Sequence, residues 1–195
     1  MRLFVLTRHA QSTLNREGRV NGKPGVSAPL TPEGRTQAAQ LGYEVTALPL
    51  DLCVHTRFGR TLETAELALA GRSVPRTSEP LLDDVDVGEL EGVSIERYRA
   101  WKHEHERDEP FPGGESLEGA ALRYAAAFRR LLEQPAQAVL VVCHEIPVRY
   151  ALNAAAGSDE LDGPAHLIPN ATPYLFDDEA LERAAASIEQ ITRSR

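Results

Sequence analysis

The chain has 195 residues, a formal net charge of −8 at pH 7, and 42% hydrophobic and 26% charged residues. These fractions are close to the averages of globular proteins and exclude a disordered, collagen-like or coiled-coil protein. A chain of this length buries roughly 70% of its unfolded surface, enough for a core without disulfides or a structural metal. Its longest apolar runs, 3–6 and 138–143, are too short to span a bilayer or to form a secretory signal. We therefore expect a single domain, residues 1–195, in the cytoplasm and without a membrane partner.

The acidic balance argues against nucleic acid as a partner, because such binding depends on clustered Lys and Arg. It does not exclude a small anionic ligand, since a few arginines in one cleft can create a local positive site. Cys53 and Cys143 each lie in an apolar run, which favours reduced, buried thiols over a disulfide. The oligomeric state stays open, and an exposed strand or helix could pair two copies in a homodimer.

Strands and helices alternate from the N-terminus. Residues 3–7 form a short apolar run that ends in polar residues, which is typical of a buried parallel strand. After a loop rich in Asn and Gly, Thr31 and Pro32 mark the start of a helix expected to reach about residue 46. Residues 52–55 predict a second strand, and apolar residues at helical spacing predict a helix after it.

The second half continues the alternation after one interruption. Residues 74–77 could form a third strand, 81–92 are acidic and irregular, and 94–105 are predicted to be helical. A loop rich in Pro and Gly covers 108–114, and a long amphipathic helix begins near Ser116. Residues 138–143 give the clearest strand, followed by a helix to about 156, a last strand over 172–176 and a C-terminal helix.

This order predicts an α/β fold, a three-layer αβα sandwich with a mostly parallel central sheet. The segment from about 94 to 114 breaks the rhythm and ends in a Gly-Gly pair. We expect it to form a small helical and loop cap over the carboxyl ends of the strands. Ligands bind beyond those ends in sheets of this kind.

The residues that follow three of the predicted strands are suited to binding phosphate. Arg8 and His9 follow the first strand, Arg57 and Arg60 follow the second, and His144 follows the strand over 138–143. Arginine offers a planar fork of donors that matches phosphate oxygens. Histidine is able to hold a transferred group covalently. The sequence therefore predicts a phosphate site with a candidate histidine nucleophile.

Six blocks of sequence, in order along the chain, resemble the histidine phosphatase superfamily, in its phosphoglycerate-mutase-like branch. The blocks are Thr7–Asn15, Pro29–Gly34, Arg60–Ala65, Asp86–Gly92, Pro112–Ser116 and Val142–Arg149. The first is similar to the family's Arg-His-Gly signature, with Ala10 where the family usually has glycine. Six ordered blocks reaching to about residue 149 carry far more weight than one motif alone.

The resemblance implies that His9 is the nucleophile that becomes phosphorylated. It also implies that Arg8, Arg60 and His144 surround the transferred phosphoryl group, with Asn15 in reach. Two arginines and a histidine supply donors to the equatorial oxygens, so the chemistry calls for no metal and no cofactor.

Asp84 stands where many members have glutamate, and the resemblance implies that it is the proton donor to the leaving oxygen. A donor of this kind needs a raised pKa, which neighbouring carboxylates and burial favour and nearby arginines oppose. Asp83 is the alternative donor.

Several other polar residues have a plain structural interpretation. Arg57 lies one helical turn before Arg60 and is as easily a surface charge as a phosphate ligand. His103 and His105 alternate on a helix and do not share a face, which favours a solvated segment over a metal site. Trp101 is favoured as a core residue over one that lines the substrate.

Glu145 departs from the family pattern, because the position after the second histidine is usually glycine. A carboxylate that points into the pocket repels a phosphate dianion. Three alternatives follow for Glu145. It turns away from the pocket, it selects a substrate with a cationic or hydroxyl-rich part, or it impairs the enzyme.

The function expected from these residues is that of a metal-independent phosphomonoesterase acting on a small phosphorylated metabolite. A phosphoglycerate-type mutase is the alternative within the family. The resemblance implies that mutases of this family are longer chains with extra segments that cover the site, so a chain of 195 residues favours hydrolysis. A catalytically weak member that binds a phosphorylated ligand as a sensor or scaffold is a third alternative, which Glu145 keeps open. A phosphoprotein phosphatase is neither supported nor excluded, and the physiological substrate is open.

Overall fold

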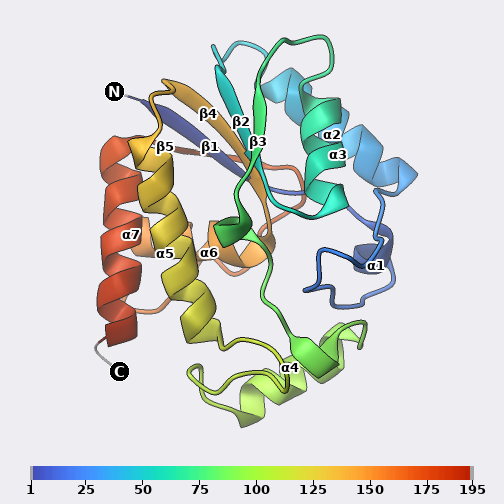
Figure 1. The fold of residues 1–195 in the computed structure, drawn as a ribbon, viewed down its shortest axis with the longest axis vertical. Helices are drawn as coiled ribbons and strands as arrows, with labels where there is room; N and C mark the ends of the chain where they lie inside the picture. Colours follow the sequence, from blue (N-terminus) through green and yellow to red (C-terminus); the bar gives the residue numbers. More distant parts are fainter. Residues whose placement is uncertain (1, 194–195) are drawn as a thin grey trace.

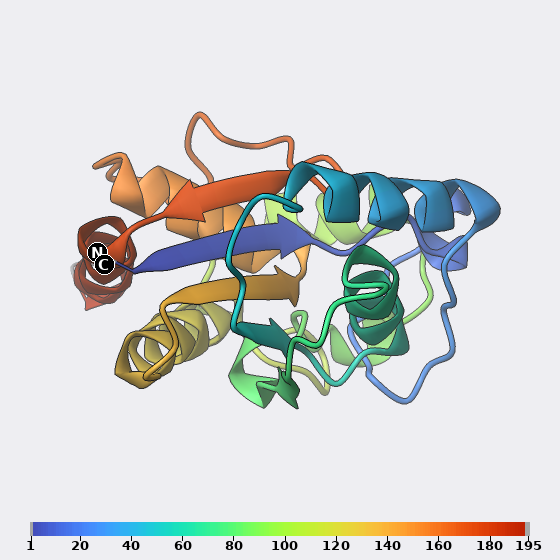
Figure 2. The ribbon, with the colours of Figure 1, turned by 90° about the horizontal axis from the view of Figure 1, so that it is seen from above.

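A five-stranded sheet forms the centre of the computed structural model, which describes residues 2–193. Its order is β3-β2-β4-β1-β5, and the strands are β1 (Leu3–Arg8), β2 (Leu52–His55), β3 (Arg76–Ser78), β4 (Ala138–Cys143) and β5 (Pro173–Phe176). The first four strands pair in parallel, whereas β5 runs antiparallel to β1, as Figure 2 shows. The expected α/β class with a mostly parallel sheet is confirmed.

Helices cover both faces of this sheet. The helices of the described residues are α1 (Thr13–Arg16), α2 (Pro32–Glu44), α3 (Gly59–Ala68), α4 (Ile95–Glu104), α5 (Leu117–Glu133), α6 (Glu145–Ala155) and α7 (Asp178–Arg193). The pair α2 and α3 packs on one face, and α5, α6 and α7 pack on the other (Figure 1). The three layers are therefore the expected ones.

The strand β4 explains how one sheet serves two apolar cores. All six of its residues are buried, as expected of a central parallel strand covered on both faces. Its side chains alternate, so Leu140 and Val142 belong to the cluster with α2 and α3. Val139 and Val141 belong to the larger cluster with α5, α6 and α7.

Helix starts follow from local sequence. Thr31 caps α2 by accepting a hydrogen bond from the Gly34 amide at 2.9 Å, and Pro32 occupies the first helical position. Ser116 caps α5 in the same way through the Gly119 amide at 2.9 Å. These are the starts that the sequence predicts.

Three local features differ from the predicted elements. The third strand was expected over 74–77 and forms over Arg76–Ser78, where all three residues are exposed and the apolar pattern is weak. The short helix α1 and two 3-10 turns, Pro80–Leu82 and Gly88–Leu90, lie in segments predicted to be irregular.

None of the helices formed by residues 2–193 combines the length with the apolar character that crossing a membrane requires.

The carboxyl ends of β1, β2 and β4 point to one edge of the sheet. Figure 1 shows α1 and α4 beyond this edge, with α4 separated from the two helix layers. The residues that follow these strands are therefore brought together beneath α4.

Candidate active site

A cavity of about 800 Å³ lies beyond the carboxyl ends of β1 and β4. One end, called the histidine end below, is formed by His9, Arg60 and Asp84, with His144 buried behind them. The other, called the α4 end, is formed by residues of one helix: Ile95, Tyr98, Arg99 and Lys102. The sides carry Arg8, Ser12, Asn15, Gly18, Arg19, Val20, Asn21, Gly22, Val85, Val87, Glu145, Ile146, Arg149, His166, Leu167, Ile168 and Pro169.

His9 presents one ring nitrogen to the cavity in its unprotonated form. Its Nδ1 lies 2.7 Å from the carbonyl oxygen of Ala10, which can only accept, so Nδ1 carries the hydrogen. The Nε2 atom therefore has a free electron pair, and it accepts a hydrogen bond of 2.9 Å from Arg60 Nε. Burial, together with the charges of Arg60 and Arg8, holds the pKa of His9 well below its ordinary value. The ring is neutral at pH 7.

Arg60 is held in a fixed orientation by a residue of the N-terminal loop. Its Nη1 donates to the side-chain oxygen of Asn21, and its Nη2 donates to the Asn21 carbonyl at 3.1 Å. The guanidinium also lies 4.2 Å from the centre of the Phe58 ring. The same Nη2 is 3.1 Å from Asp84 Oδ2, so one side chain bridges the nucleophile candidate and the candidate acid.

His144 lies at the start of α6 and is fully buried. Its Nδ1 is 3.1 Å from Arg60 Nη2 and 3.4 Å from Asp84 Oδ2. Burial is the main cause that holds the pKa of His144 well below its ordinary value, and the charge of Arg60 is the next. His144 is therefore a second neutral histidine whose Nδ1 faces the reactive groups.

Two threonine hydroxyls hold the other side of this ring. The Thr61 hydroxyl donates to the carbonyl of Phe58 at 2.8 Å, so its oxygen is free to accept from the Thr56 hydroxyl at 2.9 Å. The Thr56 oxygen then accepts from Nε2 of His144 at 3.0 Å. This chain of hydrogen bonds puts the His144 proton on Nε2 and leaves its Nδ1 to accept from Arg60.

Asp84, and not Asp83, lies on the cavity wall. Its Oδ1 accepts from the Val85 amide at 3.1 Å, and burial raises the pKa of its carboxyl against the opposing charge of Arg60. Its side chain is 25% exposed, so water reaches it. Asp83 instead accepts from the backbone and the side chain of Arg57, at 2.9 and 2.5 Å.

Glu145 does not turn away from the cavity. Its Oε2 is 2.9 Å from Arg8 Nη1, which also donates to the Ile168 carbonyl at 2.9 Å. Its Oε1 is 3.2 Å from Arg149 Nη1, and Arg149 Nη2 pairs with Asp162 at 2.8 Å. Glu145 lines the cavity, which excludes the first of the three alternatives, and its charge is paired with those of Arg8 and Arg149.

The sequence profile of one family, described as the histidine phosphatase superfamily (branch 1), matches residues 4–190. The chain belongs to this superfamily. It is a histidine phosphatase superfamily enzyme, a phosphatase or a mutase, and the resemblance of its six sequence blocks is confirmed.

Proteins similar to this chain are named as mutases and as phosphatases. The protein named "Probable phosphoglycerate mutase GpmB" of Salmonella choleraesuis is 30% identical over 160 residues, which cover 78% of this chain and 74% of the relative. The structure of Bacillus stearothermophilus YhfR is 26% identical and covers 90% of each chain, with a TM-score of 0.79. The alpha-ribazole phosphatase of Shigella flexneri, 24% identical with a TM-score of 0.78 and 90% of each chain covered, shares the fold.

Three other residues singled out in the sequence take different places in the structure. Asn15 lines the cavity, and its Oδ1 accepts from the Ser12 amide at 3.1 Å, which leaves the Nδ2 hydrogens for a ligand. Arg57 is 58% exposed, pairs with Asp83, and is not among the described residues that line the cavity. Trp101 packs against Phe111 with ring centres 4.2 Å apart, as its core interpretation predicts.

A segment around residue 170 holds the backbone of the nucleophile, and no sequence pattern indicates this role. The Asn170 side chain donates to the carbonyl of His9 at 2.7 Å, and the Ala171 amide donates to the carbonyl of Arg8 at 2.9 Å. Ala171 adopts a left-handed φ of 52°, which a residue with a Cβ rarely takes. Asn21 and Thr56 were missed for the same reason, since only the folded chain brings them to the histidines.

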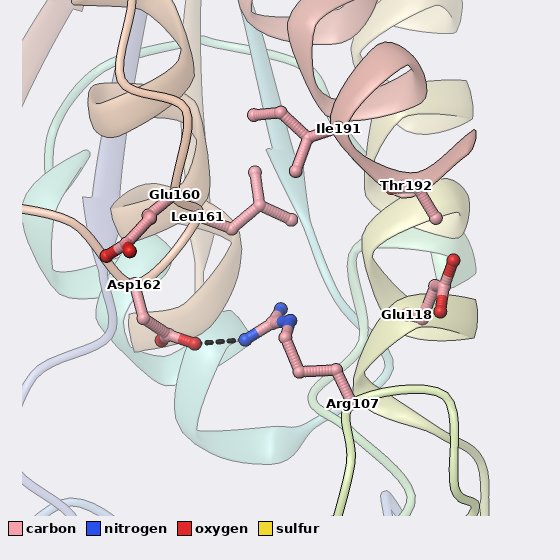
Figure 3. Close-up of a pocket in the computed structure, with 7 residues that line it drawn as sticks. All are labelled: Arg107, Glu118, Glu160, Leu161, Asp162, Ile191 and Thr192. Carbon is pink, nitrogen blue, oxygen red and sulfur yellow. Dashed lines mark hydrogen bonds and ion pairs between the residues drawn. The ribbon is translucent and has the colours of Figure 1, made fainter. Parts of the chain in front are cut away.

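A second, smaller cavity of about 230 Å³ lies beside α7 (Figure 3). Arg107 extends into it and pairs with Asp162, while its Nη2 donates to the Tyr150 hydroxyl at 2.6 Å. Its other lining residues are Glu118, Glu160, Leu161, Ile191 and Thr192. Three carboxylates against one guanidinium make this cavity unsuited to a phosphate ester.

Proposed function

We propose that this enzyme is a metal-independent phosphomonoesterase that hydrolyses a small phosphorylated metabolite through a phosphohistidine on His9. The observation that carries the proposal is the neutral His9 ring, whose Nε2 electron pair lies 2.9 Å from Arg60 at the histidine end. Arg60 in turn contacts Asp84, whose raised pKa suits a proton donor.

In the first step, His9 Nε2 attacks phosphorus. The incoming phosphoryl group replaces Arg60 Nε as the partner of that electron pair. The Nε2–P bond forms as the bond from phosphorus to the ester oxygen breaks, and Asp84 gives its proton to the departing oxygen. Arg8 and Arg60 donate hydrogen bonds to the equatorial oxygens, where charge gathers in the transition state.

In the second step, water takes the place of the departed alcohol. Asp84, now a carboxylate, accepts a proton from the water as its oxygen bonds to phosphorus and the P–Nε2 bond breaks. His9 returns to its neutral form, Asp84 is protonated again, and inorganic phosphate leaves. One carboxyl thus acts as acid and then as base.

Water access favours hydrolysis over the mutase alternative. A mutase must keep its phosphohistidine from water, whereas the Asp84 side chain beside His9 is 25% exposed. Glu145 pairs with Arg8 and Arg149, which offsets part of the negative charge that it brings to the phosphate site. This supports an active enzyme over a sensor.

The test is hydrolysis of p-nitrophenyl phosphate with a chelator present, for the wild type, for His9→Ala, and for His103→Ala as a control. His103 is an exposed histidine on α4 that does not line the cavity. We expect turnover that survives the chelator, is lost in His9→Ala and persists in His103→Ala, with an alkali-stable phosphoenzyme in the wild type and in His103→Ala but not in His9→Ala. Turnover that persists in His9→Ala, or that needs an added divalent metal, overturns the proposal. Transfer of phosphate between hydroxyls with little free phosphate identifies the mutase.

A further inference from the structure

The proposed proton donor lies in a segment without regular secondary structure. Residues 83–87, between the two 3-10 turns, belong to no helix or strand. The stretch 81–86, called the acid loop below, carries two adjacent aspartates, and of these Asp84 lines the main cavity while Asp83 does not. Because no helix or strand ladder fixes this loop, the direction of the Asp84 side chain depends on groups outside the loop.

Arg123 on α5 holds the backbone of the acid loop. Its Nη1 donates to the carbonyl oxygens of Leu81 at 2.8 Å and of Asp83 at 2.9 Å. Its Nη2 lies 3.4 Å from the carbonyl oxygen of Asp84. The Arg123 side chain is 20% exposed and is not among the described groups that line the main cavity. One planar guanidinium therefore contacts three carbonyl groups of the loop from the side opposite the substrate.

Glu115, just before α5, completes this attachment. Its Oε1 is 2.6 Å from Arg123 Nη2, and its Oε2 is 3.2 Å from Arg123 Nε. Oε1 also accepts from the Asp86 amide at 3.0 Å, and the Glu115 amide donates to the Asp86 carbonyl at 2.9 Å. The pair of Glu115 and Arg123, called the clamp below, thus holds the acid loop on both sides of Asp84.

The carboxylate of the clamp also matters for the charge around the acid. A guanidinium close to a carboxyl group lowers its pKa, whereas a proton donor needs a raised pKa. Glu115 offsets part of the positive charge that Arg123 brings to the loop. The clamp therefore combines firm hydrogen bonds to the backbone with a limited electrostatic effect on the acid.

The other aspartate of the loop is turned away from the cavity. Asp83 has an extended backbone, with φ −55° and ψ 154°, and its carboxylate binds the backbone and the side chain of Arg57. Neighbouring side chains of an extended segment point to different sides. With Asp83 held outward and its carbonyl held by Arg123, the Asp84 side chain is directed to the cavity, where it meets Arg60 at 3.1 Å.

We infer that Arg123 is a positioning residue for the general acid, and that Glu115 acts through it. The clamp keeps the Asp84 carboxyl where the leaving oxygen accepts its proton. The inference rests on the proposed phosphomonoesterase function and deepens it. A displacement of about 1 Å is enough to slow a reaction roughly 10²-fold. Loss of the clamp therefore slows substrates whose leaving oxygen needs a proton and spares those whose leaving group departs without one.

The test compares two phosphate esters of similar size. Benzyl phosphate releases an alkoxide that requires a proton, and p-nitrophenyl phosphate releases a phenolate that does not. The leaving-group ratio is kcat/KM for the first ester divided by kcat/KM for the second, so a loss of folded enzyme cancels. We expect Arg123→Met to lower this ratio about tenfold to 100-fold. Arg123→Lys keeps a cationic donor without the planar fork and lowers the ratio less.

Arg129→Met is the matched control. Arg129 lies on the same helix and pairs with Glu182 and Glu189 of α7 instead of the acid loop. Its loss removes ion pairs of α5, and the leaving-group ratio stays at the wild-type value. If Arg123→Met does not fold, Arg123→Lys carries the same comparison. A wild-type ratio in the Arg123 variants that fold overturns the inference.

A double variant shows whether Arg123 acts through the acid. Asp84→Asn lowers the leaving-group ratio by itself, and we expect Arg123→Met to lower it no further in that background, because the acid that the clamp positions is gone. A further fall as large as that in the wild-type background contradicts the inference. If Asp84→Asn leaves the ratio unchanged, the acid of the proposed function and the inference fail together. If Asp84→Asn lowers the ratio and the Arg123 variants do not, the positioning role alone fails.

Discussion

The two ends of the main cavity differ in how their polar groups are satisfied. At the histidine end, Arg60 bonds to Asn21, His9, Asp84 and His144, and nearly every donor has a protein acceptor. At the α4 end, the ammonium of Lys102 makes no hydrogen bond or ion pair with residues 2–193, lies 5.4 Å from the centre of the Tyr98 ring, and is acted on by Asp162 and Glu145 at longer range. The first end is fixed before the substrate arrives, as a transition state with defined geometry requires. The second is not held by such a network within residues 2–193.

Asp84→Asn gives the largest effect and acts on the fixed end. We expect kcat for an alkyl phosphate to fall by roughly 10²–10⁴-fold, because the leaving oxygen loses its acid. The loss is much smaller for p-nitrophenyl phosphate, whose leaving group departs without a proton. In the wild type the rate falls as pH rises through the raised pKa of Asp84, and this fall is absent in the variant. Asp159→Asn, an exposed carboxylate, is the control, and equal losses on both substrates contradict the role as acid.

Thr56→Val tests whether the His144 proton is held by the threonine chain. The substitution keeps the shape and leaves the buried Nε2–H of His144 without its acceptor. We expect the free energy of unfolding in urea to fall by about 1–3 kcal/mol. The pH dependence of kcat also changes, because the His144 proton is free to move to Nδ1. Thr56→Ser restores both properties, and a variant with wild-type values of both rules out this role.

The two neutral histidines make stability depend on pH. Burial lowers the pKa of His9 and of His144 in the folded chain below the unfolded value of 6.5. Their contribution is complete above pH 6.5 and is lost as pH falls below it, since the unfolded chain then binds more protons. Each histidine contributes a slope of about 1.4 kcal/mol per pH unit in that range. Denaturant unfolding between pH 7 and 5 measures it, and His144→Gln reduces the slope whereas His103→Ala does not.

Glu145→Gln has the smallest expected effect, at the border between the two ends. The substitution keeps an acceptor for Arg8 and Arg149 and removes a negative charge near the phosphate site. We expect KM for p-nitrophenyl phosphate to fall about threefold to tenfold at low salt, and less at high salt. Glu160→Gln, which lines only the smaller cavity, is the control. A KM that rises in Glu145→Gln indicates that the carboxylate positions Arg8 more than it repels phosphate.

The layout of the fold and the chemical residues at the strand ends could be predicted from the sequence. A continuous apolar run such as 138–143 identifies a central strand, and parallel strands bring the residues after their carboxyl ends together. The positions of His9, Arg60 and His144 follow from that rule alone. Arg57 follows the same strand as Arg60, but its ion pair with Asp83 holds it outside the cavity. Periodicity does not report such a local competition for a partner.

Residues that act through long-range contacts could not be predicted. Asn21 lies in a loop whose composition indicates turns and nothing else, and its bonds to Arg60 join positions 39 residues apart. Lys102 belongs to a charged helix, and its contact with the Tyr98 ring is visible only after folding. The strand β3 begins at Arg76, two residues later than predicted, because an exposed edge strand carries little apolar pattern.

The segment that ends in Ala171 has a consequence for how the enzyme comes into being. Ile168, Asn170 and Ala171 hold the Arg8 side chain and the backbone of Arg8 and His9, so the first catalytic block is completed by a segment 160 residues further along the chain. During synthesis the N-terminal strand leaves the ribosome long before this segment exists. A chain synthesised only as far as residue 170 therefore holds its nucleophile in an unfinished site, and this site is completed only when the segment 168–171 has folded against it.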